Sequence, residues 1–268
     1  MWDIFNVKGL VIAALIFVPL EHLLALHNGQ RHLRRLWRLD LVYALFNSLI
    51  TKAGLGLIVV AAALASEAAI PTEARGFVSA IPLWAQVPLA IVLSDLGFYS
   101  VHRIFHRVPM LWKFHLIHHS IEELDWLAAH RVHPIDQICT KGASLLPLVV
   151  LGFSDAAFTI YAVIYYWQSL LIHANVRVAI GPLRWFLASP QFHHWHHANQ
   201  PEAYDKNFAG QLPVLDFLFG TLHLPSSRYP ERYGTRESVP SHYVKQLTYP
   251  FGAGPPVPGE PRPSGPDQ

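Results

Sequence analysis

Runs of apolar residues long enough to cross a membrane constrain this chain more than any other feature of its sequence. One run covers residues 9–26, and a second covers 41–65 with Lys52 as its one charge. A third run, 77–94, is free of charge and continues past Asp95. A helix of about twenty residues crosses the roughly 30 Å hydrocarbon core of a bilayer. The sequence therefore predicts an integral membrane protein built from helices.

Two further apolar segments, 142–153 and 156–172, are separated only by a short joint around Asp155. This spacing predicts a helical hairpin within residues 139–172 that either dips into the bilayer or crosses it twice. The composition agrees, because 14% of the residues are charged and 52% are hydrophobic, whereas soluble domains carry about 25% charged residues. We expect an all-α integral membrane bundle with about four spans or half-spans.

Basic residues give the expected bundle an orientation. The segment RHLRRLWR, residues 31–38, follows the first apolar run, and positive residues favour the cytoplasmic side of a membrane. If this segment lies in the cytoplasm, the end of the third span and the end of the hairpin lie on the cytoplasmic side as well. The clustered histidines of the chain then lie in a helical cap that faces the cytoplasm.

Charge and cysteine content exclude two kinds of partner or site. The formal net charge is +2 and the basic residues occur in small scattered groups, so the sequence has no basic stripe that could follow a nucleic acid backbone. Cys139 is the one cysteine, which excludes an intrachain disulfide framework and leaves too few thiolates for a structural zinc or iron–sulfur site. Any metal must be held by other ligands.

The chain has 17 histidines, and many of them recur at helical spacing. Residues at positions i, i+3 and i+4 share one face of a helix. One group has the i, i+4 spacing and two groups have the i, i+3, i+4 spacing: His102 and His106; His115, His118 and His119; His193, His196 and His197. The extra histidine His194 points about 100° away from the leading His193. We therefore leave His194 outside the ligand set.

Local signals predict that these groups lie on separate helices. Pro109 cannot continue a helix without a kink, so it separates the first group from the second. The Ser-Pro pair 189–190 has the order of an N-cap and a first helical residue, so we expect the helix of the third group to begin there. Ser120 and Glu123 have the spacing of a capping box for a further helical segment that ends at Pro134.

A histidine set of this size suits two metal ions. Neutral imidazole binds iron, copper, zinc and nickel, and eight ligands exceed the roughly three to six donors that one ion takes. Neither triplet contains the glutamate of the zinc-peptidase motif His-Glu-x-x-His, and the Glu-x-x-His pattern of ferritin-like proteins is absent from the sequence. We predict a dinuclear histidine-ligated site with iron and dioxygen chemistry. A zinc-dependent membrane hydrolase and a non-enzymatic metal transport or storage protein are the alternatives.

The three groups, in this order after hydrophobic spans, resemble the fatty acid hydroxylase and sterol desaturase superfamily of membrane di-iron enzymes. The resemblance runs from about residue 95 to 225 and is carried by DLGFYSVHRIFHRVPMLWKFHLIHHS, RVHPID, HANV, SPQFHHWHH and DKNFAGQLPVLDFLFGTLHLP. It implies that the eight grouped histidines bind metal. It also implies that His173 and His133 complete the ligand set.

This resemblance implies an oxidoreductase in which two iron ions and the co-substrate dioxygen hydroxylate or desaturate a lipid, with zinc able to replace iron in purified protein. Sterols, fatty acyl chains, sphingoid bases, carotenoids and ether lipids are all candidate substrates. The sequence shows no dinucleotide fingerprint and no haem or iron–sulfur module. The two electrons are therefore expected from an external donor of the ferredoxin, cytochrome b5 or reductase type.

Three aspartates are candidates for hydrogen bonds that orient the ligand imidazoles. Asp95 lies seven residues before His102, which places both side chains on the same helical face. Asp136 and Asp216 are the other two candidates.

The sequence divides into three expected regions. Residues 1–76 hold the N-terminal membrane spans, and 77–225 form the histidine-rich catalytic domain, which includes the hairpin 139–172. Residues 226–268 form a C-terminal extension, and its Pro- and Gly-rich tail is expected to be disordered from about residue 250.

Overall fold

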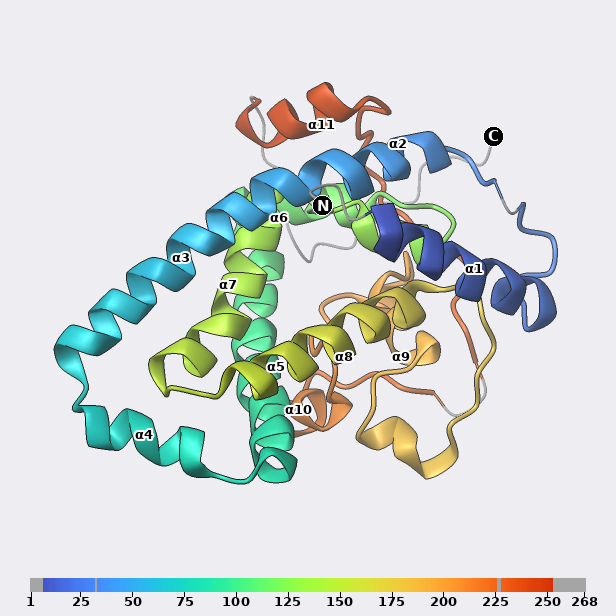
Figure 1. Cartoon of the computed structure of the whole chain (residues 1–268). Helices are drawn as coiled ribbons and strands as arrows, with labels where there is room; N and C mark the ends of the chain where they lie inside the picture. Colours follow the sequence, from blue (N-terminus) through green and yellow to red (C-terminus); the bar gives the residue numbers. More distant parts are fainter. Residues whose placement is uncertain (1–6, 32, 226–227, 253–268) are drawn as a thin grey trace.

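The computed structural model describes residues 7–31, 33–225 and 228–252 (Figure 1). Apart from isolated β-bridges, helices are the only regular secondary structure in these ranges. Backbone pairing of the β type is confined there to two isolated bridges, Ala25 with Val176 and Ala198 with Tyr233. The all-helical architecture that the sequence predicts is confirmed for the described residues.

Five long helices form the body of the molecule. They are α1 (Val7–Leu23), α3 (Ser48–Ala69), α5 (Leu83–Arg107), α7 (Pro134–Val150) and α8 (Asp155–His173). The short helix α2 (Trp37–Val42) and the π-helical turn η1 (Tyr43–Asn47) run without a break into α3. In Figure 1, α3 and α8 slant across the upright helices α5 and α7.

Among the residues that the structure describes, two segments are long and apolar enough to cross a membrane, Trp37–Ala69 and Leu83–Arg107. In the first segment, only 6% of an apolar stretch of 18 residues is buried. The side chains of Leu57 and Leu64 in this segment are 74% and 62% exposed. Such a surface suits lipid, since soluble proteins rarely expose a contiguous apolar area of this kind. The second and third predicted spans thus lie on these two segments, whereas the 17-residue helix α1 ends at Leu23, before the end of the first predicted span at residue 26.

The third apolar run is divided between two helices, which corrects the predicted start of this span. A separate helix α4 (Thr72–Ala80) ends before Pro82, and α5 begins at Leu83 rather than at residue 77. Ile81 is extended, with φ −63° and ψ 138°, because the residue before a proline is driven out of the helical region.

The predicted helical hairpin is present as the pair α7 and α8. Residues 151–154 join the two helices, and the Ser154 hydroxyl accepts a hydrogen bond from the amide of Ala157 at the start of α8. Helix α7 begins at Pro134, five residues before the predicted start of the hairpin. The path of this hairpin relative to a membrane remains a prediction.

Helices α5 and α7 touch at a glycine. A Cβ on Gly97 would lie 2.2 Å from the carbonyl oxygen of Ala143, a distance that no real Cβ tolerates. The absence of a side chain therefore lets the two backbones meet, as small residues do where membrane helices cross. This contact sets the distance between the part of α5 that carries His102 and the part of α7 that carries Asp136.

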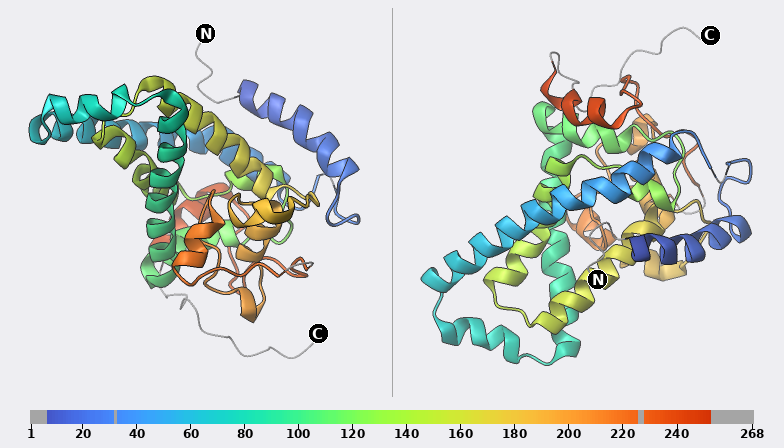
Figure 2. Two further views of the ribbon diagram at one scale, coloured as in Figure 1. Left: turned by 90° about the horizontal axis from the view of Figure 1, so that it is seen from below. Right: turned by 45° about the horizontal axis from the view of Figure 1, so that its top comes forward.

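Shorter elements gather around one end of the long helices and form the cap (Figure 2). They are α6 (Pro109–His119), η2 (Trp126–His130), η3 (Gly181–Trp185), α9 (Pro190–His196), η4 (Pro201–Ala203), α10 (Pro213–Leu218), α11 (Tyr243–Thr248) and η5 (Tyr249–Phe251). The predicted tail lies largely outside the described residues, which end at 252.

Two of the three predicted helix boundaries in the cap are confirmed. Helix α5 ends before Pro109, and the Ser189 hydroxyl caps α9 by accepting from the Phe192 amide. The capping box at Ser120 is wrong, because this residue follows the last residue of α6 and donates to the Ile117 carbonyl. Pro134 opens α7 instead of ending a helix.

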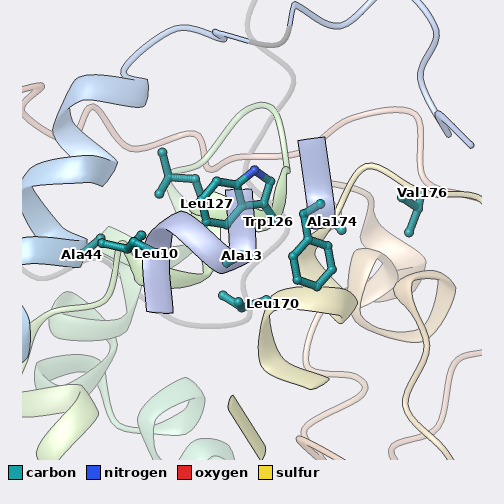
Figure 3. Close-up of a cluster of buried hydrophobic side chains, with 9 residues drawn as sticks. Leu10, Ala13, Ala44, Trp126, Leu127, Leu170, Ala174 and Val176 are labelled. Carbon is teal, nitrogen blue, oxygen red and sulfur yellow. The ribbon is translucent and has the colours of Figure 1, made fainter. Parts of the chain in front are cut away.

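A cluster of apolar side chains joins α1 to the cap and to α8 (Figure 3). Leu10 and Ala13 of α1 belong to it together with Trp126 of η2 and Leu170 of α8. Phe17 of α1 adds a stacked ring pair with Trp126, with centroids 6.3 Å apart. Burial of these apolar groups stabilises the attachment of the cap at this edge.

Candidate metal centre

Nine histidines converge in two adjacent clusters, and in each cluster the potential ligand nitrogens all lie within 4.8 Å of one another. The first cluster consists of His102, His106, His115, His119 and His196. The second cluster consists of His118, His173, His193 and His197. All eight histidines of the three sequence groups are therefore brought together, and His173 joins them from the end of α8.

Helices α6 and α9 divide their histidines between the two clusters in opposite ways. On α6, His115 and His119 enter the first cluster and His118 enters the second. On α9, His196 enters the first cluster, while His193 enters the second together with His197, the residue that follows the helix. Each triplet shares one face of its helix as predicted, but that face spans both clusters.

The inward nitrogens are spaced like neighbouring donors on one metal ion. In the first cluster, Nε2 of His115 lies 2.9 Å from Nε2 of His102 and 3.1 Å from Nε2 of His119. In the second, Nε2 of His173 lies 3.2 Å from His118 and 2.9 Å from His193. Two nitrogens bound at right angles to one ion at about 2.1 Å lie about 3.0 Å apart.

Several outward nitrogens face oxygen acceptors, which fixes the tautomer of those rings. The acceptors of Nδ1–H are the carbonyl of Phe208 for His102, Arg131 for His118, Ser169 for His173 and Lys206 for His196, at 2.7–3.1 Å. A neutral ring that donates from Nδ1 presents a lone pair at Nε2. Converging lone pairs at about 3 Å repel unless a cation lies between them, so this donor set fits metal ions.

Burial keeps the cap histidines in the form that binds metal. Every histidine of the two clusters is at most 6% exposed. Burial, reinforced by neighbouring histidines, holds the pKa of His193 and of His197 well below the ordinary value, and burial lowers the pKa of His196 to about 3. These rings are neutral at pH 7, and neutral imidazole is the ligand form.

Asp136 makes the kind of contact that the sequence predicts. Its Oδ2 lies 2.7 Å from Nδ1 of His115, and both side chains are buried. A carboxylate on the outer nitrogen orients a ligand imidazole and makes it a stronger donor.

Contrary to the prediction, Asp95 and Asp216 do not contact a cluster histidine directly but bind the backbone of a loop that does. The Asp95 carboxylate accepts from the amides of Gly210, Gln211 and Leu212, at 2.7–3.1 Å. The Asp216 carboxylate accepts from the amides of Phe208 and Ala209, at 2.7 and 2.8 Å. Together they fix the loop whose Phe208 carbonyl holds His102.

His133 is the one predicted ligand that lies outside both clusters. Its Nδ1 accepts from the Ile135 amide and caps α7, while Nε2 lies 3.1 Å from the Leu247 carbonyl. His194 also lies outside, as predicted from its turn away from the shared face. Its Nδ1 lies 2.9 Å from the Tyr233 hydroxyl and its Nε2 lies 3.1 Å from the Ala174 carbonyl.

The sequence did not reveal a buried charge network beside the second cluster. Arg34 pairs with Asp40 and Asp125, and Arg131 also pairs with Asp40. The network fixes Arg131, whose carbonyl accepts from His118. The sequence indicated only that residues 31–38 are basic, since two of the three pairs join residues 91 positions apart and leave no local signal.

Asn207 is a second residue whose role only the structure reveals. Its backbone is left-handed, with φ 60°, a conformation that asparagine tolerates better than most residues. Its side-chain amide donates to the carbonyls of Phe192 and His223, at 2.9 and 2.7 Å. Asn207 thereby ties α9 to the loop that carries Phe208. Its sequence signal is the short DKNF segment within the resemblance.

Comparison with known proteins places these histidines in a family. The fatty acid hydroxylase family model matches residues 87–221, a range that contains all nine clustered histidines. No solved structure matches the chain significantly.

Curated relatives cover the same part of the chain. Ornithine lipid hydroxylase OlsE from Rhizobium tropici is 32% identical over 170 residues, which is 63% of this chain and 51% of that protein. Human alkylglycerol monooxygenase is 31% identical over 134 residues, or 50% of this chain and 30% of that protein. A very-long-chain aldehyde decarbonylase from Oryza sativa subsp. japonica is 27% identical over 164 residues, 54% of this chain and 26% of that protein.

The chain thus spans about half the length of the ornithine lipid hydroxylase and less than a third of the other two relatives. The family match itself covers half of the chain, includes both clusters, and contains Asp95, Asp136 and Asp216. The chain belongs to the fatty acid hydroxylase family.

Proposed function

We propose that this protein is a membrane-bound di-iron oxygenase that uses dioxygen and external electrons to hydroxylate or desaturate a lipid. The observation that carries the proposal is the pair of adjacent histidine clusters, whose inward nitrogens lie 2.9–3.2 Å apart. Two clusters of five and four donors match two metal ions better than one.

The proposed ligands are the nine clustered histidines. His133 has a structural role, because its side chain caps α7. Two irons, when bound, would supply the activation of dioxygen that oxidation of an unactivated C–H bond requires. The protein holds the imidazoles in place from outside, through Asp136 and through backbone carbonyls that the buried aspartates and Asn207 immobilise. These hydrogen bonds set the ring orientation and the tautomer before metal binds.

A cavity of about 80 Å³ borders both clusters, and part of a substrate would bind there. Its walls include His102 and His115 of the first cluster and His118, His173 and His193 of the second. Phe98, Ile172 and Tyr165 supply apolar and aromatic wall, which suits a hydrocarbon chain. The volume accommodates several water-sized groups, since one water needs roughly 10–15 Å³.

The names of the relatives support lipid oxidation. An ornithine lipid hydroxylase and an alkylglycerol monooxygenase align over the histidine region of this chain. The exposed apolar helices support a membrane location, and the basic segment 31–38 favours a cap that faces the cytoplasm. An electron donor on that side would be a separate ferredoxin, cytochrome b5 or reductase.

The test is metal analysis and Mössbauer spectroscopy on protein purified without oxygen, followed by incubation with lipid extract and labelled dioxygen. We expect about two irons per chain and either oxygen-18 in a lipid product or a new double bond, each dependent on a reductant. Two zinc ions under every growth condition, with oxygen-independent hydrolysis of a lipid, would overturn the proposal in favour of a zinc hydrolase. Bound metal without turnover of any lipid class would favour transport or storage.

A further inference from the structure

Lys141 of α7 is the one lysine or arginine in the described wall of the cavity between the clusters. Its side chain is only partly exposed, and it lines the same cavity as His118 and His173. Among the described residues, its ammonium group forms no hydrogen bond and no ion pair within 4.0 Å. A cation without a partner in such a place is unfavourable, so it calls for a ligand.

The neighbouring polar groups are already engaged. Asp136, the acid nearest in chain and cavity, directs Oδ2 to His115 at 2.7 Å. The hydroxyl of Thr140 donates to the Asp136 carbonyl, and that of Ser169 donates to the Tyr166 carbonyl. Oε1 of Gln137 accepts from the Thr51 hydroxyl at 2.9 Å. These contacts leave Lys141 as the one charged donor in the described wall of the cavity, beside the neutral donors Gln137 and Tyr165.

The charge of the cavity points the same way. The clusters contain neutral imidazoles and no carboxylate, and Asp136 is the one acid in the described wall of the cavity. Its single negative charge, which is directed to His115, is smaller than the charge of two bound divalent ions. Lys141 adds a further positive charge on the same cavity. An anionic oxygen group is the ligand that such a site favours, because it accepts charge-assisted hydrogen bonds and balances the local charge.

We propose that Lys141 binds an anionic group of the lipid, a carboxylate or a phosphate, and so selects acidic over neutral lipids. This inference rests on the proposed function, because it concerns the substrate of the same site. The small cavity also places the anionic group near the clusters, so the oxidised carbon lies within a few bonds of that group. A neutral lipid of the same chain length would leave Lys141 unpaired and bind more weakly.

The experiment compares three probes with one chain length, dodecanoate, dodecyl phosphate and dodecan-1-ol, on the purified full chain in detergent without oxygen. Kd is measured by calorimetry and binding is checked by thermal shift. We expect wild-type protein to bind an anionic probe about tenfold more tightly than the alcohol, in line with a hydrogen bond to a charged group. The better of the two anions identifies the headgroup chemistry.

Lys141→Met is expected to bring the anion and the alcohol to similar affinity, while Lys141→Arg keeps a preference for the anion. Lys245→Gln removes a lysine charge from the exposed helix α11 and serves as the matched control with unchanged preference. Wild-type protein without any preference for an anion overturns the inference, even if the variants fail to fold. Equal preference in Lys141→Met and wild type overturns it as well.

If the proposed oxygenase function is wrong, the measurements differ from those that overturn the role of Lys141. In that case the protein lacks iron or oxidises no lipid, while the headgroup preference can still be read from binding alone. Equal losses of metal in Lys141→Met and Lys141→Arg, without a change in preference, would show that Lys141 only supports Asp136.

Discussion

Oδ2 of Asp136 lies 2.7 Å from Nδ1 of His115, and this contact joins the α7–α8 hairpin to the first histidine cluster. His115 is the hub of that cluster, because its Nε2 lies within 3.1 Å of Nε2 of both His102 and His119. The carboxylate therefore orients the ring on which the other rings converge.

We expect Asp136→Ala to weaken metal binding at the first cluster by about 10- to 100-fold, because the outer partner of His115 is lost. Asp136→Asn, which keeps an acceptor but loses the charge, should have a smaller effect. Metal titration monitored by spectroscopy measures both. Asp155→Asn, at an exposed acid on α8, is the control and should bind metal normally. An equal loss in the control would refute a specific role for Asp136.

Replacing one histidine from each cluster should remove different metals. His196→Ala is expected to lower occupancy of the first cluster, and His118→Ala that of the second, because each contributes an inward nitrogen to one cluster. Either change should abolish metal-dependent activity. Metal content together with Mössbauer spectra distinguishes the two sites, and loss of the same spectral component in both variants would contradict the division.

His194→Ala should retain both metals, since this ring faces Tyr233 and Ala174 rather than a cluster. Its burial adds a stability effect that the sequence did not predict. The change removes two hydrogen bonds from a buried site, although the Tyr233 hydroxyl still meets His27 and the Ala174 carbonyl still accepts from the Val176 amide. We therefore expect the unfolding free energy to fall by about 1–3 kcal/mol. A thermal melt of the metal-loaded protein measures the loss, and a drop in metal content to that of His196→Ala would disprove this assignment.

His133→Ala is expected to keep its metals and to lose about 0.5–2 kcal/mol of stability, because the side chain caps α7. His133→Asn, which restores a capping side chain, should recover most of that loss. Metal content and thermal unfolding are read on the same samples. Loss of metal comparable to that in His173→Ala would restore His133 to the ligand set.

Gly97→Ala should loosen the contact between α5 and α7, because the new methyl group would meet the Ala143 carbonyl at 2.2 Å. We expect a loss of about 1–3 kcal/mol, typical of overpacking. Gly56→Ala on α3 is the matched control, since no atom lies within 4 Å of its added Cβ, and its stability should be equal or higher. Similar melting temperatures for both variants would exclude a special role for the glycine contact.

The histidine set was predictable because helical periodicity is a local property. Spacings of three and four residues place side chains on one face wherever the helix lies, and the eight histidines that this spacing predicted meet in the structure. His173, which the family resemblance suggested, joins them. His133 lies apart from both clusters and caps α7, and capping uses the same ring nitrogens as ligation. The family resemblance could not distinguish these two uses at the start of α7.

The loop between Phe208 and Leu212 shows a different limit. Its carbonyl and amides carry the contacts to His102, Asp95 and Asp216, and every residue has such groups. Asp95 shares a helical face with His102, so the expectation of a direct contact was reasonable. The structure instead inserts a loop from more than 110 residues later in the chain.

The sequence by itself determined that this chain is helical, that its apolar runs suit a membrane, and which histidines share a face, because these properties depend on composition and on the fixed pitch of a helix. The tertiary structure decided how the two triplets are divided between clusters, which acid touches which ring, and where Lys141 stands. Those outcomes depend on the docking of α6, α7 and α9 against one another, and docking is set by contacts between residues far apart in the chain.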